Sequence, residues 1–237
     1  IHDGAIGTLV GGQCYYNTGG LWRRPIAKDW TEAEAQIRNW YYYTWLSGDH
    51  IVEQHIHNID LMNWCFGGPP VKAIGMGGRQ VRTDSRYGNI WDHFAVEFEY
   101  YGGPRVISMC RQTDGCTRRI TEYIIGTKGQ ACPRVGTIAD LKGKVTWKFA
   151  GKQMDPSIQE HADAIAGIRA GKPINYGRRV AESTMTAILG RMSAYTGREI
   201  KFSWAMKSSK LNLMPKDLKF GPLPVRDVAM PGKTKVM

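Results

Sequence analysis

The chain has 237 residues, which is enough for one or two domains. Its hydrophobic fraction of 42% and charged fraction of 22% are ordinary for a globular protein and exclude a disordered or collagen-like chain. The net charge of +11 is concentrated in residues 102–154 and 201–237, and because no zinc-knuckle, RNP or basic-heptad motif accompanies it, we expect a charged surface and no nucleic-acid partner.

The first part of the chain has the pattern of one strand followed by two helices. Residues 6–16 contain β-branched and aromatic residues between glycines, which predicts a strand. Thr31 with Glu34 three residues later matches a capping box, so a helix is expected over about 31–46. After a short glycine-containing turn, a second helix is expected over 50–66.

The rest of the chain predicts a sheet and then two more helices. Strands are expected at 71–81, 90–100, 104–113, 118–127 and 144–149. Helices are expected at 156–171 and 178–196, before a proline-containing extended tail. This order predicts an α+β fold, a mainly antiparallel open sheet with helices packed on one face. We expect one domain over 1–205 and an extended tail over 206–237.

Several motifs are missing, and their absence narrows the class of protein. No G-x-G-x-x-G fingerprint stands at a strand-to-helix turn, and GMGG at 75–78 falls inside a predicted strand. The five cysteines are odd in number and include no C-x-x-C, so free cysteines are expected. No apolar run approaches the roughly 18 residues of a membrane span, so no membrane partner is expected.

Residues 47–64, SGDHIVEQHIHNIDLMNW, are the segment most indicative of chemistry. On a continuous helix, His50, Glu53, His57 and Asp60 share one face, while the opposite face is apolar. His55 falls on the apolar side and is expected in the core.

Three interpretations of this polar face are open. A histidine with a neighbouring carboxylate can act in general acid–base catalysis. His50, Glu53 and His57 could instead supply nitrogen and oxygen ligands to a metal ion. The third interpretation is a structural polar face whose side chains bond to one another.

The segment GDHIVEQHIHNIDLMNW resembles the signature helix of the Gfo/Idh/MocA oxidoreductases. GAIGTLV near the start, and EHADAIAGIRAGKPINY, VAESTMTAILGRMSAYTGREIKFSW and PGKTK further on, are similar to that family as well. The resemblance covers nearly the whole chain and implies the family's C-terminal domain, which binds substrate and forms the oligomer. The family's Rossmann domain, which binds NAD or NADP, has no counterpart in this sequence, so we expect that domain and its cofactor site to be absent from the chain.

The resemblance also implies roles for the polar face. The family has an acidic residue, a histidine four positions later and usually an aspartate three further on, which correspond here to Glu53, His57 and Asp60. His57 is the implied acid–base that takes the proton of a sugar hydroxyl, and Glu53 is its partner, although the family more often has aspartate there. Asp60 is assigned to substrate binding. His50 belongs to one subfamily's pattern and is expected to bind substrate or to complete a metal site.

Four residues outside this segment are further candidates for substrate binding. Trp22 could stack on a sugar ring, and Arg23 and Lys28 could hold an acidic or hydroxylated sugar. The alternative for these three is a solvated loop. Arg111, on a predicted strand, could border the site.

These observations predict the substrate domain of an NAD(P)-dependent oxidoreductase that acts on a secondary hydroxyl of a sugar, polyol or glycoside. Two alternatives are an NAD-dependent glycosidase or lyase acting by transient oxidation, and a non-catalytic carbohydrate-binding or assembly module. The expected partners are a carbohydrate or polyol substrate and further copies of the chain, joined through the sheet face. The resemblance implies a bacterial protein and favours the periplasm, reached by twin-arginine export, over the cytoplasm.

Overall fold

A computed structural model of the protein describes residues 1–151 and 154–237. Within these residues, nine strands form one sheet in the order β8-β7-β6-β5-β1-β4-β3-β2-β9. The strands are β1 (Leu9–Thr18), β2 (Lys72–Gly78), β3 (His93–Glu99), β4 (Arg105–Gln112), β5 (Arg119–Gly126), β6 (Gly129–Cys132), β7 (Thr137–Asp140), β8 (Val145–Lys148) and β9 (Ile200–Lys201). The β1–β4 pair is parallel, and the other pairs are antiparallel.

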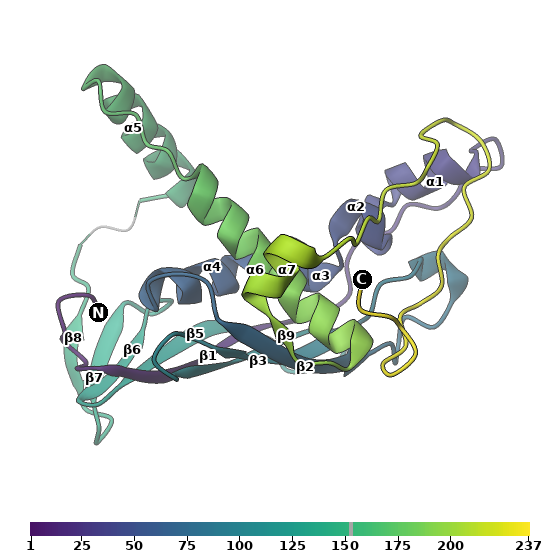
Figure 1. Ribbon diagram of the computed structural model, residues 1–237. Helices are drawn as coiled ribbons and strands as arrows, with labels where there is room; N and C mark the ends of the chain where they lie inside the picture. The colour runs from purple at the N-terminus through teal and green to yellow at the C-terminus, as the bar shows by residue number, and fades with distance from the viewer. Residues whose placement is uncertain (152–153) are drawn as a thin grey trace.

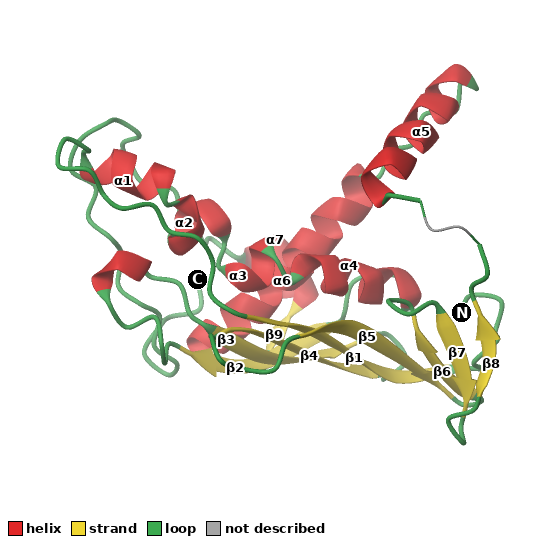
Figure 2. Cartoon of the chain, turned by 180° about the vertical axis from the view of Figure 1, so that it is seen from behind, coloured by secondary structure: helices red, strands yellow, loops and turns green. Residues whose placement is uncertain are grey.

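The helices lie on one face of this sheet (Figures 1 and 2). They are α1 (Glu32–Arg38), α2 (Thr44–Ser47), α3 (His50–Glu53), α4 (Ile56–Cys65), α5 (Pro156–Arg169), α6 (Gly177–Thr196) and α7 (Phe202–Ser208), with 3₁₀ turns at Trp40–Tyr42 and Ser85–Tyr87. The core fills the space between α4, α6 and the sheet, with Met62, Phe98, Val106, Ile124 and Leu189 almost fully buried. The predicted α+β fold with helices on one face is therefore confirmed.

The described residues leave the other face of the sheet uncovered. Strand alternation directs Ile74, Met76 and Met109 to that face, and all three side chains are exposed, Met76 by 71%. Helix α5 also lacks buried residues and projects away from the sheet together with the first turns of α6 (Figure 1).

The expected helix over 31–46 is present only in pieces. Its start is confirmed, because the Thr31 hydroxyl accepts a hydrogen bond of 3.2 Å from the Glu34 backbone N–H. The helix ends at Arg38 because the side chain of Asn39 turns to the preceding loop, where its Oδ1 accepts a bond of 2.8 Å from the Arg24 N–H. A 3₁₀ turn and α2 then continue the chain.

The expected helix over 50–66 is also divided, into α3 and α4. The backbone N–H of His55 donates to the carbonyl of His50, five residues back, at 3.1 Å. Such a wide turn shifts all later side chains around the helix axis, and turns of this kind are frequent at functional sites. The single helical wheel drawn from the sequence therefore does not hold across Gln54.

The sequence did not predict β6, β7, β9 or α7. Helix α7 crosses the expected domain boundary at 205/206, and the division into a domain and a tail stays a prediction. After Ser208 the described chain runs without helix or strand and returns to α1, where the Leu223 N–H donates to Glu32 Oε2 at 2.7 Å. In the described part of the chain, no helix is both long and apolar enough to cross a membrane.

The buried layer predicts a contrast between two isoleucines. Ile124→Ala on β5, where the side chain has no exposed surface, should lower the free energy of unfolding by roughly 2–5 kcal/mol because it leaves a cavity. Ile26→Ala in the exposed loop before α1 should change it by no more than about 0.5 kcal/mol. Urea unfolding followed by tryptophan fluorescence measures both, and equal losses would contradict this description of the core.

Candidate functional site

The turn that leads into α3 is organised by the carboxylate of Asp49, which has no exposed surface. One oxygen, Oδ1, accepts from the backbone N–H of His50 at 2.6 Å and lies 3.1 Å from its Nδ1. The other, Oδ2, accepts from the Trp91 backbone N–H at 2.8 Å and from the Tyr195 hydroxyl. Asp49 is also the one described non-glycine residue with positive φ (73°), a conformation that costs energy outside glycine.

This environment defines the state of His50. Because the other partners of Asp49 are N–H and O–H donors, the carboxylate acts as the acceptor, and Nδ1 of His50 donates to it. In a neutral ring, Nε2 then carries the lone pair. Nε2 is buried and has no hydrogen-bond partner among the described residues.

His50 therefore differs from its expected position. The sequence placed it on an open polar face, but the side chain is completely buried and its ring packs edge-on against Phe94 at 5.1 Å between centroids. In this conformation His50 can support α3 from within, and direct contact with a substrate would require the turn to open.

Glu53, at the end of α3, lies at the boundary between core and solvent. Its side chain is partly exposed, while Oε2 is buried without a hydrogen-bond partner among the described residues. Burial, and secondly the charge of Glu53, raise the pKa values of the phenols of Tyr16 and Tyr41. The carboxylate thus lies within electrostatic reach of two tyrosines from β1 and the 3₁₀ turn.

His57 is in the first turn of α4 and is exposed. No side-chain hydrogen bond involves its ring among the described residues, so the exposed imidazole can contact a ligand. The ring follows Glu53 by four residues across the wide turn at Gln54, whose side-chain oxygen accepts a 2.6 Å bond from the Tyr16 hydroxyl.

Asp60 is held by a neighbouring helix. Its Oδ2 accepts from the Arg179 guanidinium at 2.7 Å, and its Oδ1 accepts from the Ser183 hydroxyl at 2.7 Å. Both partners belong to α6, so Asp60 joins α4 to α6 in this structure. A role in substrate binding would have to compete with these bonds.

The three histidine and carboxylate ligands of the metal interpretation are not assembled. Residues 1–151 and 154–237 contain no group of three His, Cys, Asp or Glu side chains arranged to hold a metal ion. The reason is the division of the helix, which buries His50 while His57 faces solvent.

The loop candidates lie against the aromatic segment after α1. Trp22 is 46% exposed and lies 6.2 Å from Trp40 between ring centroids. Arg23 donates to the carbonyl of Arg86 at 3.0 Å, and Lys28 is exposed. No hydrogen bond among the described residues joins this loop to His57.

Arg111 is separated from the helices by the sheet. Alternation along β4 points it to the uncovered face, opposite Asn17 of β1 and His93 of β3, and it donates to the Thr117 carbonyl at 3.0 Å. Since α3 and α4 lie on the other face, Arg111 does not border the His57 region in this structure. The prediction that Arg111 lies on a strand did not show which face of the sheet its side chain occupies.

His55 is in the core, as the sequence predicted. Its Nε2 bonds to the Ser108 hydroxyl of β4 at 2.7 Å, and its Nδ1 lies 3.4 Å from Oδ1 of Asn58, whose amide in turn donates to Glu122 of β5. Burial lowers the pKa of His55 to about 3, so the ring is neutral. This network anchors the start of α4 to the middle of the sheet.

Sequence reasoning missed the residues that surround the polar face from other elements. Tyr16, Tyr41 and Tyr195 come from β1, the 3₁₀ turn and α6, and no local spacing connects them with residues 50–57. Asp49 could have been found, because an aspartate directly before a helix is a common cap.

The GMGG run of the sequence is part of a strand in this structure. The glycine run 75–78, the most glycine-rich candidate for a phosphate cradle, lies inside or at the end of β2 and not between a strand and a helix. The expectation that this stretch is a strand is confirmed.

The first 132 residues, more than half of the chain, match the family model of the GFO/IDH/MocA C-terminal domain. The chain therefore belongs to the Gfo/Idh/MocA oxidoreductase family. A comparison with curated proteins found no match.

Three solved structures share this fold. An aldose-aldose oxidoreductase from Caulobacter crescentus, complexed with glycerol, is 17% identical with a TM-score of 0.61, over 84% of this chain and 57% of that one. A myo-inositol 2-dehydrogenase from Lactobacillus plantarum is 16% identical with a TM-score of 0.58, over 84% of this chain and 58% of that one. A dehydrogenase from Bordetella pertussis, in complex with NADH and UDP-GlcNAcA, is 18% identical with a TM-score of 0.55, over 85% of this chain and 56% of that one. The chain thus spans less than three fifths of each of these proteins.

The buried imidazole predicts a pH-dependent stability. Because the pKa of His55 is about 3 in the folded protein and 6.5 in an ordinary histidine, unfolding takes up a proton between these pH values. The contribution of His55 to stability should therefore be complete above about pH 6.5 and should fall as the pH decreases toward about 3.

His55→Gln, which keeps a polar side chain that cannot titrate, should give a shallower dependence of the free energy of unfolding on pH. His161→Gln on the exposed helix α5 is the matched control and should retain the slope of the unchanged protein. Urea titrations at a series of pH values provide the measurement. Parallel curves for His55→Gln and the unchanged protein would show that His55 is not a buried neutral base.

Proposed function

We propose that this chain is the substrate domain of an NAD(P)-dependent oxidoreductase acting on a secondary hydroxyl of a sugar, polyol or glycoside. The observation that carries the proposal is the exposed imidazole of His57 in α4. The chain that contains it belongs to a family of oxidoreductases. The similar structures from Caulobacter, Lactobacillus and Bordetella, described with sugar- or polyol-related activities or ligands, support this choice of substrate class.

In the proposed reaction, His57 accepts the proton of the substrate hydroxyl. An exposed imidazole suits this step because its ring nitrogen can accept a proton from a hydroxyl within hydrogen-bond reach. Glu53 precedes His57 by four residues across the wide turn, and we propose its partly buried carboxylate as the partner of the imidazole.

NAD or NADP is the proposed hydride acceptor, since a dehydrogenase of similar fold was solved in complex with NADH. We propose that the residues that bind it lie outside this chain. We propose Trp22, Arg23 and Lys28, on the loop before α1, as contacts for the sugar. We also propose that the protein is exported to the periplasm.

The test of this role is His57→Ala in the natural protein together with its nucleotide-binding part. Loss of a positioned general base should lower kcat by about 10²- to 10⁴-fold, with a smaller effect on KM. Glu53→Gln should lower kcat by a smaller factor. Formation of NADH or NADPH from a panel of polyols and sugars measures the rate.

His161→Ala is the matched control, because that histidine is exposed on α5 and bonds within its own helix to the Ser157 carbonyl. Full activity in His57→Ala would refute the proposed role. Cleavage of a glycoside without net accumulation of reduced cofactor would favour the glycosidase alternative over a dehydrogenase.

We also propose that the uncovered sheet face joins two copies of the chain. Ile74, Met76 and Met109 form an exposed apolar row on β2 and β4, and such patches on a soluble protein mark interaction sites. The proposal predicts that Met76→Asp, which places a charge in the centre of this face, converts the oligomer into monomer.

Sedimentation velocity of the natural protein measures the change in mass. Met206→Asp on α7, where the side chain is 56% exposed on the helical side, is the matched control and should leave the mass unchanged. An unchanged mass for Met76→Asp would place the subunit contact elsewhere.

A further inference from the structure

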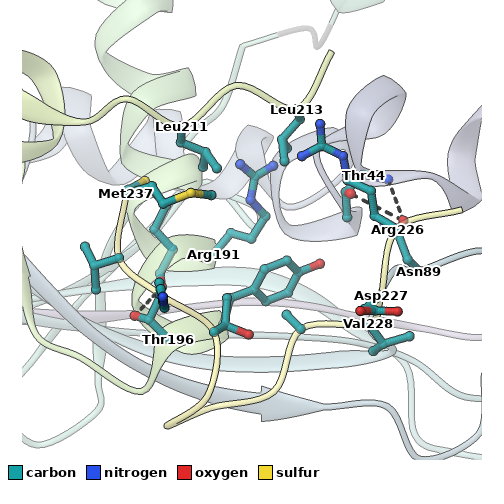
Figure 3. A pocket seen from close by; sticks show the side chains of 16 residues that line it. Thr44, Asn89, Arg191, Thr196, Leu211, Leu213, Arg226, Asp227, Val228 and Met237 are labelled. Carbon is teal, nitrogen blue, oxygen red and sulfur yellow. Dashed lines mark hydrogen bonds between the residues drawn. The ribbon is translucent and has the colours of Figure 1, made fainter. Parts of the chain in front are cut away.

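A cavity of about 250 Å³ lies between α6 and the C-terminal segment, far along the chain from the candidate catalytic residues (Figure 3). Its walls come from α6, from Thr44 and Asn89, and from residues 211–213, 226–229 and 234–237. An engineered apolar cavity of about 150 Å³ is known to hold benzene, so this volume is enough for a small organic molecule.

The unusual member of the lining is Arg191. Its side chain is only 4% exposed, although arginine is seldom buried without an ionic partner. Among the described residues its guanidinium makes one hydrogen bond, from Nη1 to the Gly48 carbonyl at 2.9 Å, and no salt bridge. Burial lowers the pKa of Arg191, with partial compensation from Tyr195 and Asp49.

A second guanidinium reaches the same cavity from the C-terminal segment. Arg226 donates to the carbonyls of Asn212 and Met214 at 3.3 and 3.4 Å, which are long hydrogen bonds. In the part of the chain that the structure describes, Arg226 forms no salt bridge. Figure 3 shows both guanidinium groups near Leu211 and Leu213, with the carboxylate of Asp227 further away.

The other walls are largely apolar. Besides the two leucines they include Met192, Val228, Ala229 and Val236. Two guanidinium groups with free donors at one end of an apolar space form a site for a carboxylate attached to an apolar body, because arginine binds carboxylates through paired N–H donors.

We propose that this cavity binds a small organic monocarboxylate, held through Arg191 and Arg226, with its apolar part against Leu211, Leu213 and Val228. The ligand is separate from the substrate proposed for His57. It adds a negative charge at the guanidinium of Arg191 and attaches the C-terminal segment to α6.

The test is calorimetric titration of the natural protein with hexanoate and benzoate, and with hexan-1-ol and benzyl alcohol as uncharged controls. Saturable binding of at least one carboxylate, with no binding of its alcohol, is expected. Arg226→Gln should weaken that binding at least 10-fold, whereas Arg178→Gln, an exposed arginine paired with Glu182, should leave it unchanged.

Arg226→Gln could weaken binding by disturbing the fold, because it removes a charge. A second variant therefore tests the cavity without changing any charge. Leu213→Trp keeps both arginines but fills the cavity, and should abolish binding while thermal unfolding stays cooperative. The proposal is overturned if neither carboxylate binds, if the alcohols bind as well as the acids, or if Arg226→Gln and Leu213→Trp bind like the unchanged protein.

Discussion

The carboxylate of Asp49 is the interaction on which the candidate site depends. It joins the start of α3 to the chain before β3 through Trp91, and to α6 through Tyr195. These segments lie far apart in the sequence, and the buried carboxylate collects a donor from each. Since an unsatisfied buried donor costs about 1–3 kcal/mol, this set of bonds offsets the strain of the positive φ at Asp49.

A second buried network, from His55 to Ser108 and Asn58, fixes the start of α4. Together with the bonds of Asp49 it determines which side chains of α3 and α4 are buried and which are exposed. The backbone widens at Gln54 between them, so His55 turns inward to Ser108 while His57 turns outward. A regular helix would have placed His50, Glu53 and His57 on one open face. The division instead leaves one exposed imidazole and one half-buried carboxylate, and His50 is enclosed.

Local chemistry made much of the fold predictable. Alternation in β3 and β4, the Thr31 cap and the two late helices depend on neighbouring residues, and the structure has them close to the expected bounds. The short strands β6 and β7 escaped prediction because four residues carry too little pattern, and their stability comes from pairing with β5. The breaks at Asn39 and Gln54 escaped because their causes are tertiary bonds.

For the site, the sequence by itself determined the family resemblance, the segment that carries the polar residues, and the buried position of His55. Only the tertiary structure decided that His50 is enclosed, that Asp60 is bonded to α6, and that Arg111 lies across the sheet. The physical reason is that a side chain's neighbours from distant segments set its exposure and its hydrogen bonds. Periodicity within one segment describes a face, and packing decides whether that face meets solvent, another helix or the core.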